Sequence, residues 1–298
     1  MRFWLIVALG FVVFFAKKHT GKNLLNPTNK LDFTFNAHTT DILEELHDSV
    51  PKSALFQISQ ILSGEFNGGK KWKNGYVFDV KQNESYKKLL FLVGESQSML
   101  MLLCKKSANW HVQDTLSFDI QTPTQFKPLN KNLFMVVSNE NSYQTYHLAR
   151  IVEDALVRAA EIPGSRFMRK GYLVTDIMTC LVLNEKSEDI DLQYDIRLIK
   201  DSIGNMMLCD TLFYTNLKHN YVYSKEQKEY RCSYMPDGIQ NDQIAYLKKI
   251  EDGELFFKAF NNEINIIFEC GNQQQRDRLL VIKSLISNNA VLQSTDLQ

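Results

Sequence analysis

The spacing of hydrophobic positions changes several times along the chain, and each change predicts an element of secondary structure. Between residues 41 and 64, apolar side chains recur every three or four positions, as they do on one face of a helix. Asp41 can cap the start of this segment, because Glu44 follows at the spacing of a capping box. Pro51 breaks or kinks the segment. The pattern therefore predicts a helix from Asp41 and a second helix that ends at Gly64.

Strand-like spacing begins at residue 76. Candidate strands cover residues 76–80, 89–93, 99–104 and 109–120. In the last of these, Trp110, Val112 and Leu116 alternate with polar residues and should share one face of a sheet. The next segment, 121–131, contains two prolines and shows no period, so it predicts a linker between two domains.

The second half repeats this order of elements. A short strand at 133–137 precedes the segment 142–161, which is apolar over most of a helical circumference and predicts a buried helix ended by Pro163-Gly164. Four strands are then indicated at about 171–184, 189–200, 206–217 and 221–234, with a hairpin turn at Gly204-Asn205. The chain should finish with a helix near 239–251, a strand at 264–270 and a helix over 272–287.

The predicted fold class is α+β, with long meandering antiparallel β-sheets packed on helices. The order of helix then strands occurs twice, and a hydrophobic helix is expected at the N-terminus. Strand 189–199 alternates almost perfectly, which is typical of an antiparallel sheet with one solvated face. The predicted domains are 39–120 and 132–298, on either side of the linker 121–131.

The first eighteen residues contain the longest apolar run. The run 3–16 has no polar side chain, while Arg2 precedes it and Lys17 and Lys18 follow it. As a helix it would span roughly 21 Å, which is short for a hydrocarbon core of about 30 Å and normal for a signal peptide. The lysines after the run do not suit a cleaved export signal, and neither does Phe14, the third residue before a cut after Ala16.

Residues 1–18 are therefore interpreted as an uncleaved membrane anchor or signal segment, followed by a tether over 19–38. The excess of lysine after the run favours a chain body on the cytoplasmic side of the membrane. The alternatives are a cleaved signal with export, and a buried apolar helix of a soluble fold. The residues expected at the membrane are Phe3, Trp4, Leu5, Phe11, Phe14, Phe15, Lys17 and Lys18.

Charge and cysteine content narrow the range of functions. The 34 basic and 34 acidic residues cancel, so no global field favours nucleic acid as a partner. The five cysteines are far apart and each lies in or beside an apolar run, which favours buried free thiols over a zinc site or disulfide framework. One disulfide, such as Cys180 with Cys209, is the alternative. No phosphate-binding loop, dinucleotide fingerprint or metalloprotease motif occurs, so neither cofactor nor metal is expected.

Asp114 is the candidate for acid–base chemistry. It interrupts the apolar face of the strand 109–120, beside Val112 and Leu116. Burial without a partner raises the pKa of a carboxyl group, and such groups are candidate acids or bases. The alternative is that Asp114 lies at the rim of the sheet or pairs with a lysine.

Charged residues elsewhere could contact a cation, a partner protein or anionic lipid headgroups. A solvated strand face explains Asp189, Asp191 and Asp195 better than a cation or basic-partner site does. Two basic patches contain aromatic residues. For the second, an ordinary surface hairpin is favoured, and contact with a headgroup, a partner protein or nucleic acid is the alternative. The first patch comprises Lys70, Lys71, Trp72 and Lys73, and the second includes Lys218, Tyr221 and Tyr223.

These features predict a membrane-anchored, non-enzymatic α+β protein whose sheet faces bind a partner protein, for example as an adaptor or a subunit of an envelope complex. The alternative is a carrier or sensor that holds a lipid or small apolar ligand between a curved sheet and a helix. The aromatic content permits a cavity but equally permits a filled core. A hydrolytic or acid–base enzyme around Asp114 is the third hypothesis. No feature of the sequence predicts the oligomeric state.

Overall fold

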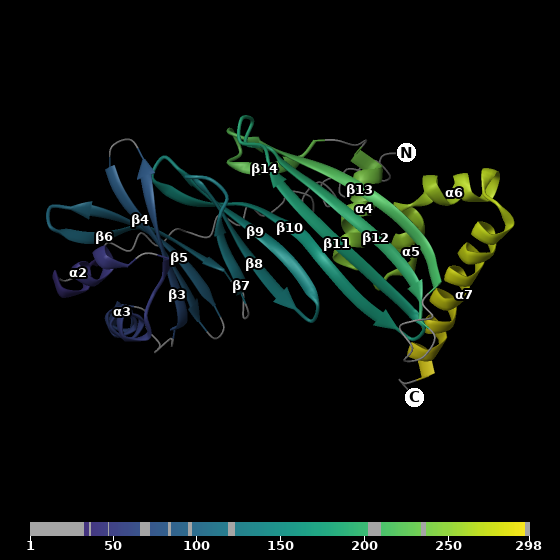
Figure 1. Cartoon of the computed structure of the whole chain (residues 1–298), viewed down its shortest axis with the longest axis horizontal. Helices are drawn as coiled ribbons and strands as arrows, with labels where there is room; N and C mark the ends of the chain where they lie inside the picture. The colour runs from purple at the N-terminus through teal and green to yellow at the C-terminus, as the bar shows by residue number, and fades with distance from the viewer. Residues whose placement is uncertain are drawn as a thin grey trace, which may run out of the picture. The chain divides into compact units, whose positions relative to one another are not determined.

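Two antiparallel β-sheets and a smaller number of helices make up the part of the chain that is described (Figure 1). The computed structural model describes residues 33–35, 37–46, 48–65, 72–82, 85–94, 97–118, 123–201, 210–233 and 237–295. The α+β class and the antiparallel sheets predicted from the sequence are confirmed. The predicted hydrophobic helix over 1–18 lies outside the described residues.

The first sheet has six strands in the order β1-β6-β5-β4-β3-β2. Helices α2 (Ala37–Glu45) and α3 (Lys52–Glu65) pack on one of its faces. The four central strands form a meander, and the two short strands add to its edges. The strands are β1 (Phe33–Thr34), β2 (Asp48–Ser49), β3 (Trp72–Gln82), β4 (Ser85–Gly94), β5 (Ser98–Lys106) and β6 (Asn109–Phe118).

The second sheet has eight strands, and each pairs with the next along the chain. Consecutive pairing needs only short connections, so the whole sheet is one meander. The strands are β7 (Pro123–Pro128), β8 (Leu133–Glu140), β9 (Tyr143–Val152), β10 (Ala155–Lys170), β11 (Leu173–Leu183), β12 (Ile190–Lys200), β13 (Asp210–Ser224) and β14 (Glu229–Cys232).

Four helices follow the second sheet and cover part of one face, which we call the inner face. Figure 1 shows these helices gathered against β10 to β13. Leu192, Tyr194 and Ile196 of β12 lie on the inner face, whereas Asp191, Gln193 and Asp195 lie on the outer face. The helices are α4 (Asp237–Lys248), α5 (Gly253–Ala259), α6 (Asn261–Cys270) and α7 (Gln273–Thr295).

Strands β4 and β5 of the first sheet are buried on both faces, because helices cover one side and the second sheet covers the other. Leu90 and Leu92 belong to the core beneath α2 and α3, while Leu89 and Phe91 belong to a core shared with β8 and β9. Strands with two buried faces have continuous apolar sequences in place of alternation. The runs at 89–93 and 99–103 have this composition.

The predicted helix over 142–161 is wrong. These residues form β9 and the start of β10, joined by a tight turn in which Glu153 and Asp154 have φ values of 49° and 68°. Strand β9 is buried on both faces from Tyr146 to Ile151, so its apolar residues show no strand period. At the start of β10 the buried residues Leu156, Ala159 and Ile162 recur every three positions, as on a helix, because the pairing shifts register there. The expected helix terminator, Pro163-Gly164, lies instead within an irregular stretch of β10.

The predicted strand at 264–270 is also wrong, because residues 261–270 form helix α6. The order of helix then strands occurs only in the first sheet, since in the second half the strands precede the helices. The strands predicted at 206–217 and 221–234 are β13 and β14, with β13 running on to Ser224. The turn expected at Gly204-Asn205 lies outside the described residues. The segments predicted as tether and linker contain β1 and β7 respectively.

Candidate ligand-binding groove

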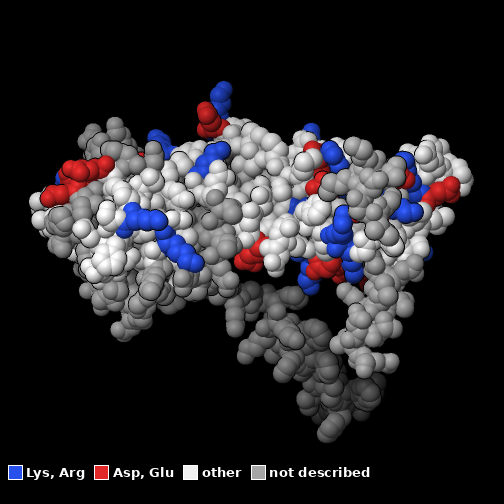
Figure 2. Space-filling view, turned by 60° about the horizontal axis from the view of Figure 1, so that its bottom comes forward, with Lys and Arg blue, Asp and Glu red and all other residues white. Residues whose placement is uncertain are grey.

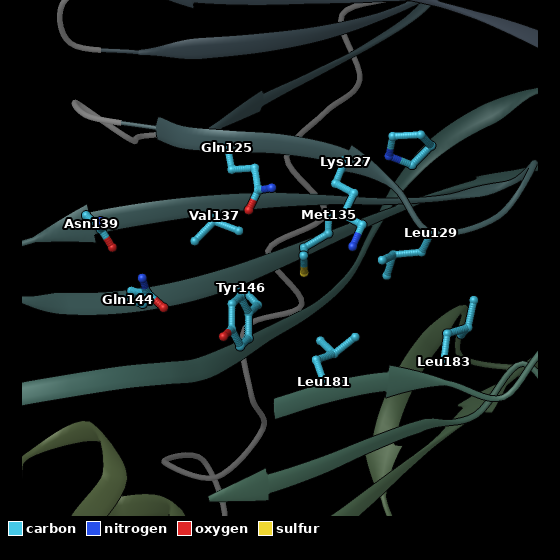
Figure 3. Close-up of a pocket in the computed structure, with 11 residues that line it drawn as sticks. Gln125, Lys127, Leu129, Met135, Val137, Asn139, Gln144, Tyr146, Leu181 and Leu183 are labelled. Carbon is cyan, nitrogen blue, oxygen red and sulfur yellow. The ribbon is translucent and has the colours of Figure 1, made fainter. Parts of the chain in front are cut away.

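A groove opens on the inner face of the second sheet, beyond the part that the helices cover. Helices α4 and α7 pack on β10, β11 and β13, whereas the groove is bounded by β7, β8, β9 and the end of β11. Its volume is about 590 Å³, within the range of small-molecule sites. Figure 3 shows side chains from opposite walls directed into this space.

The register of β7, β8 and β9 places the lining residues in three successive rows. Neighbouring rows are about 7 Å apart along the strands, because they are separated by two residues. The first row consists of Lys127 and Met135, the second of Gln125, Val137 and Tyr146, and the third of Asn139 and Gln144. A charged amine therefore marks one end of the groove, and two amides mark the other.

The opposite wall consists of Leu181 and Leu183 of β11, with Leu129 at one corner. Strand β10 separates β9 from β11 within the sheet, so both can line one groove only if the sheet curls. The β9–β10 pairing shifts register after Arg158 and again after Pro163. Such bulges bend a strand and increase its twist, which accounts for the curl.

Contacts of Arg150 hold the curled sheet in place. This β9 side chain forms an ion pair with Glu188 in the turn after β11, and it donates to the Tyr230 hydroxyl of β14 at 3.3 Å. Its guanidinium also lies 4.1 Å from the centre of the Tyr223 ring. Burial raises the pKa of Tyr230 to about 12, so its hydroxyl keeps the proton that it donates to the Glu188 carbonyl oxygen at 3.0 Å.

Gly164 gives the groove wall its shape. A Cβ atom at this position would lie 2.9 Å from the Gln144 Cβ and 3.1 Å from the Tyr146 ring. Any larger residue would displace two of the side chains that line the groove. The glycine is therefore required by the close approach of β10 to β9.

Lys127 is the single charged residue among those that line the groove. Its side chain is exposed, and it has no ion pair with any residue that the structure describes. The remaining polar lining groups are neutral amides and the Tyr146 hydroxyl. The groove thus combines an aliphatic floor, a rim of hydrogen-bonding groups and one positive charge.

The surroundings of Asp114 differ from those expected of an unpaired acid or base. It is 5% exposed and accepts hydrogen bonds from the backbone N–H groups of Leu156 at 2.7 Å and Thr115 at 2.8 Å. The first of these bonds joins the two sheets, since Leu156 belongs to β10. Because two backbone N–H groups donate to it, Asp114 is explained as a structural hydrogen-bond acceptor and not as an unpaired catalytic acid.

A bulge explains why Asp114 breaks the apolar pattern of β6. The pairing with β5 moves from Leu103–Val112 to Leu102–Asp114, so Gln113 is an extra residue. Trp110 and Val112 consequently face the helices, whereas residues after the bulge face the second sheet. The single apolar face predicted for 110–120 is therefore wrong.

Ser138, His147 and Glu161 form the described group that most resembles a nucleophile, base and acid. Ser138 Oγ lies 3.0 Å from His147 Nε2, and His147 Nδ1 lies 3.7 Å from Glu161 Oε2. Burial lowers the pKa of His147, and the Glu161 carboxylate opposes that shift. However, Ser138 is only 4% exposed and lines neither the groove nor the hollows of about 430 and 250 Å³. The group is explained by a buried hydrogen bond between Ser138 and His147 beside an exposed Glu161 carboxylate.

The structure does not bring the predicted partner-contact residues together. Trp72 is 8% exposed and packs in the core beneath α2 and α3, beside an exposed Lys73. Tyr221 is 7% exposed on the inner face, whereas Lys218 lies on the outer face and lines the hollow of about 430 Å³. Tyr223 contacts Arg150. Lys70 and Lys71 lie outside the described residues.

The acidic residues of β12 lie on an accessible face, as expected, whereas two cysteines are more accessible than the sequence suggested. Asp191 and Asp195 accept hydrogen bonds from the Asn220 and Asn216 side chains across the outer face. Cys180 and Cys270 are exposed thiols, which corrects the expectation of burial for these two, and Cys104 and Cys232 are half-buried. None of these four cysteines forms a disulfide with a described residue. Cys209 lies outside the described residues.

Comparison with known proteins identifies no relative. No family model, no curated protein and no solved structure matches the chain. Among the helices that the structure describes, none combines the length and the apolar character needed to cross a bilayer. The membrane residues predicted over 3–18 lie outside the described part. Functional inference therefore rests on the groove and on the sheet surfaces.

No sequence pattern pointed to the groove. Gln125 and Lys127 lie in the segment predicted as a linker, and Gln144 and Tyr146 lie in the segment predicted as a helix. The lining residues come together only through the register of β7, β8 and β9 and the curl of the sheet. A correct strand assignment for 143–152 would have been needed to find them.

Proposed function

We propose that this chain is a binding protein whose second sheet holds a small amphipathic molecule in the groove. The observation that carries this proposal is a wall of core-type side chains that no helix covers in the part of the chain that the structure describes. Met135, Val137 and Tyr146 continue the apolar inner face, yet they line an open space beside a free lysine. These three side chains are largely buried, and a groove that combines apolar walls with a few polar groups is typical of ligand sites.

The proposal can be tested with N-phenyl-1-naphthylamine, a neutral fluorescent probe of apolar sites. The full chain should increase probe fluorescence in a saturable way with one site. Leu181→Arg places a charge in the groove wall and should abolish saturable binding. Val182→Arg is the matched control, because Val182 is the next residue and is 55% exposed on the outer face. Equal probe binding by both variants would contradict the proposal.

A protein partner on the outer face is a second candidate function, and it continues the leading sequence-based hypothesis. Met178, Cys180 and Val182 form an exposed stripe along β11, beside Asp191 and Asp195 of β12. A hollow of about 430 Å³ adjoins the stripe and could receive a side chain of the partner. A partner with basic and apolar residues would complement it.

The sheet edges favour a partner on the face over one that adds a strand. Edge strands β1 and β2 have two residues each, β14 has four, and β7 begins and ends with proline. Short edges and edge prolines are the means by which sheets avoid pairing with other chains.

Thiol protection tests the partner hypothesis. Cys180 should react with a maleimide more slowly in native membranes than in the purified chain, because a bound partner would cover it. Cys270 is also exposed and serves as the internal reference thiol. Equal protection of both cysteines, or of neither, would exclude a partner specific to the outer face.

Membrane anchoring through residues 1–18 is part of the same proposal. The support remains the apolar run and the lysines that flank it. A fusion that reports sidedness, combined with the mass of the mature chain, distinguishes an uncleaved anchor from a cleaved signal. A full-length chain recovered entirely in the soluble fraction would remove the anchor.

A further inference from the structure

We propose that the ligand of the groove is an aliphatic monocarboxylate that carries a hydrogen-bonding group at its far end. This inference rests on the proposed function and adds the chemistry of the ligand. It follows from the order in which charge, apolar surface and amides succeed one another along the rows of β7, β8 and β9.

The charged end of the groove should bind an anionic group. Lys127 pairs with Met135 across the strands, and Figure 3 shows its amine directed into the space above Met135. None of the described lining residues is acidic, so none of them neutralises this amine. A carboxylate placed here would form a charge-assisted hydrogen bond, with the Gln125 amide in the next row as a second donor.

The middle of the groove calls for an aliphatic body. Val137 and Met135 form one side, and Leu181 and Leu183 face them from β11. The lining contains one aromatic ring, that of Tyr146, which belongs to the buried core of the inner face. Flexible apolar walls of this type suit a methylene chain, because each methylene that leaves water adds to the affinity.

The far end calls for a hydrogen-bonding group. Asn139 and Gln144 pair directly across β8 and β9 and form the third row. Four residues separate this row from that of Lys127, which corresponds to about 13 Å along the strands. A plain alkyl end would remove water from the Gln144 amide without replacing its hydrogen bonds, whereas a terminal hydroxyl would replace one of them. A ten-carbon chain is about long enough to join the two ends.

Three probes separate the parts of this inference: 10-hydroxydecanoate, decanoate and 1,10-decanediol. They share the aliphatic body and differ in one end group at a time. Isothermal titration calorimetry on the full chain in lipid nanodiscs gives the affinities, with empty nanodiscs as the blank. We expect 10-hydroxydecanoate to bind most tightly, and both other probes to bind about tenfold or more weakly, because each leaves polar groups of the groove unpaired.

Two variants assign each end group to its residue. Lys127→Met should weaken 10-hydroxydecanoate and decanoate by about tenfold or more and leave 1,10-decanediol unchanged. Lys131→Met is the matched control, because Lys131 is an exposed lysine four residues further on that does not line the groove. Gln144→Met should remove the preference for 10-hydroxydecanoate over decanoate.

The outcomes distinguish failure of this inference from failure of the proposed function. Equal affinities for 10-hydroxydecanoate and the diol, both lost in Leu181→Arg, would overturn the carboxylate assignment while the binding function stands. Absence of saturable binding for all three probes and for N-phenyl-1-naphthylamine would overturn both. A Lys131→Met effect as large as that of Lys127→Met would reduce the charge dependence to a general surface field and would also overturn the assignment.

Discussion

Strand β4 of the first sheet and strand β12 of the second show how differently one chain uses its strands. Every side chain from Lys87 to Gly94 is buried, whereas buried and accessible residues alternate from Ile190 to Leu198. The first pattern comes from a strand enclosed between helices and a second sheet, and the other from a strand with one open face. Accessible surface for ligands and partners is therefore concentrated on the second sheet.

Charged residues in the two regions differ in the same way. Lys87 and Lys88 of β4 are both buried, and each forms an ion pair, with Asp154 and Asp79 respectively. Lys127 at the groove has no such pair among the described residues. Figure 2 shows basic and acidic side chains interspersed over the visible surface, with no extended area of one sign. Lys127 thus differs from Lys87 and Lys88 because it has no ion-pair partner among the described residues.

The largest effect should come from the core between the two sheets. Phe91 is fully buried and stacks on Phe126 of the second sheet, with ring centres 4.8 Å apart. Phe91→Ala should lower the free energy of unfolding by about 3–5 kcal/mol, because it leaves a cavity between the sheets. Tyr214→Ala on the outer face is the control and should cost far less. Denaturant unfolding followed by circular dichroism measures both, and similar losses would contradict the two-sided burial of β4.

A smaller loss is expected at Asp114. Asp114→Ala removes the acceptor for the buried Leu156 N–H and should cost about 1–3 kcal/mol of unfolding free energy. Asp114→Asn keeps an oxygen acceptor and should retain part of that stability. The comparison also bears on the enzyme hypothesis, because a structural acceptor predicts a stability effect in Ala that Asn reduces. If both variants were as stable as the wild type, the bond between the sheets would be energetically unimportant.

The next prediction concerns pH and the core of the second sheet. Burial lowers the pKa of His219 below its ordinary 6.5, although the hydrogen bond that its Nε2–H donates to Gln243 Oε1 at 3.3 Å opposes the shift. The unfolded chain therefore binds a proton at a higher pH than the folded chain, so the stability that His219 contributes is present above about pH 6.5 and is lost below it. His219→Gln should reduce the slope of unfolding free energy against pH between about 6.5 and the lowered value. If the slope of unfolding free energy against pH were unchanged in His219→Gln, His219 would not be the source of the pH dependence.

The comparison of the two sheets also shows what the sequence could predict. The alternation from Ile190 to Leu198 identified a half-exposed strand correctly, because one covered face leaves a period of two. The helix prediction for 142–161 is wrong because β9 is covered on both faces and has no such period, while a bulge in β10 spaces the buried residues three apart. Glu153 and Asp154 adopt positive φ in the turn between them, and neither residue type is a strong turn signal by itself.

The bulge in β6 shows a second reason why the sequence pattern does not predict the structure. Alternation from Trp110 to Leu116 assumes an unbroken strand, and the extra residue Gln113 reverses the faces without any change in the pattern. Asp114 looked like an intrusion into an apolar face, although it lies at the start of a different one. The groove could not be predicted for a related reason, since its lining depends on bulges in β10 and on the Arg150 contacts that hold the curl.

The smallest change in the free energy of unfolding should come from substitutions on the outer face. Met178 and Val182 are 45% and 55% exposed, so Met178→Ser and Val182→Ser should each change the free energy of unfolding by less than about 0.5 kcal/mol. Leu192→Ser on the neighbouring strand is the matched inner-face variant and should cost several times more, because Leu192 is buried beneath the helices. The measurement should be repeated at two protein concentrations. A large, concentration-dependent loss in Met178→Ser would mean that another copy of the chain covers this face, because only a surface buried by association has its stability linked to concentration.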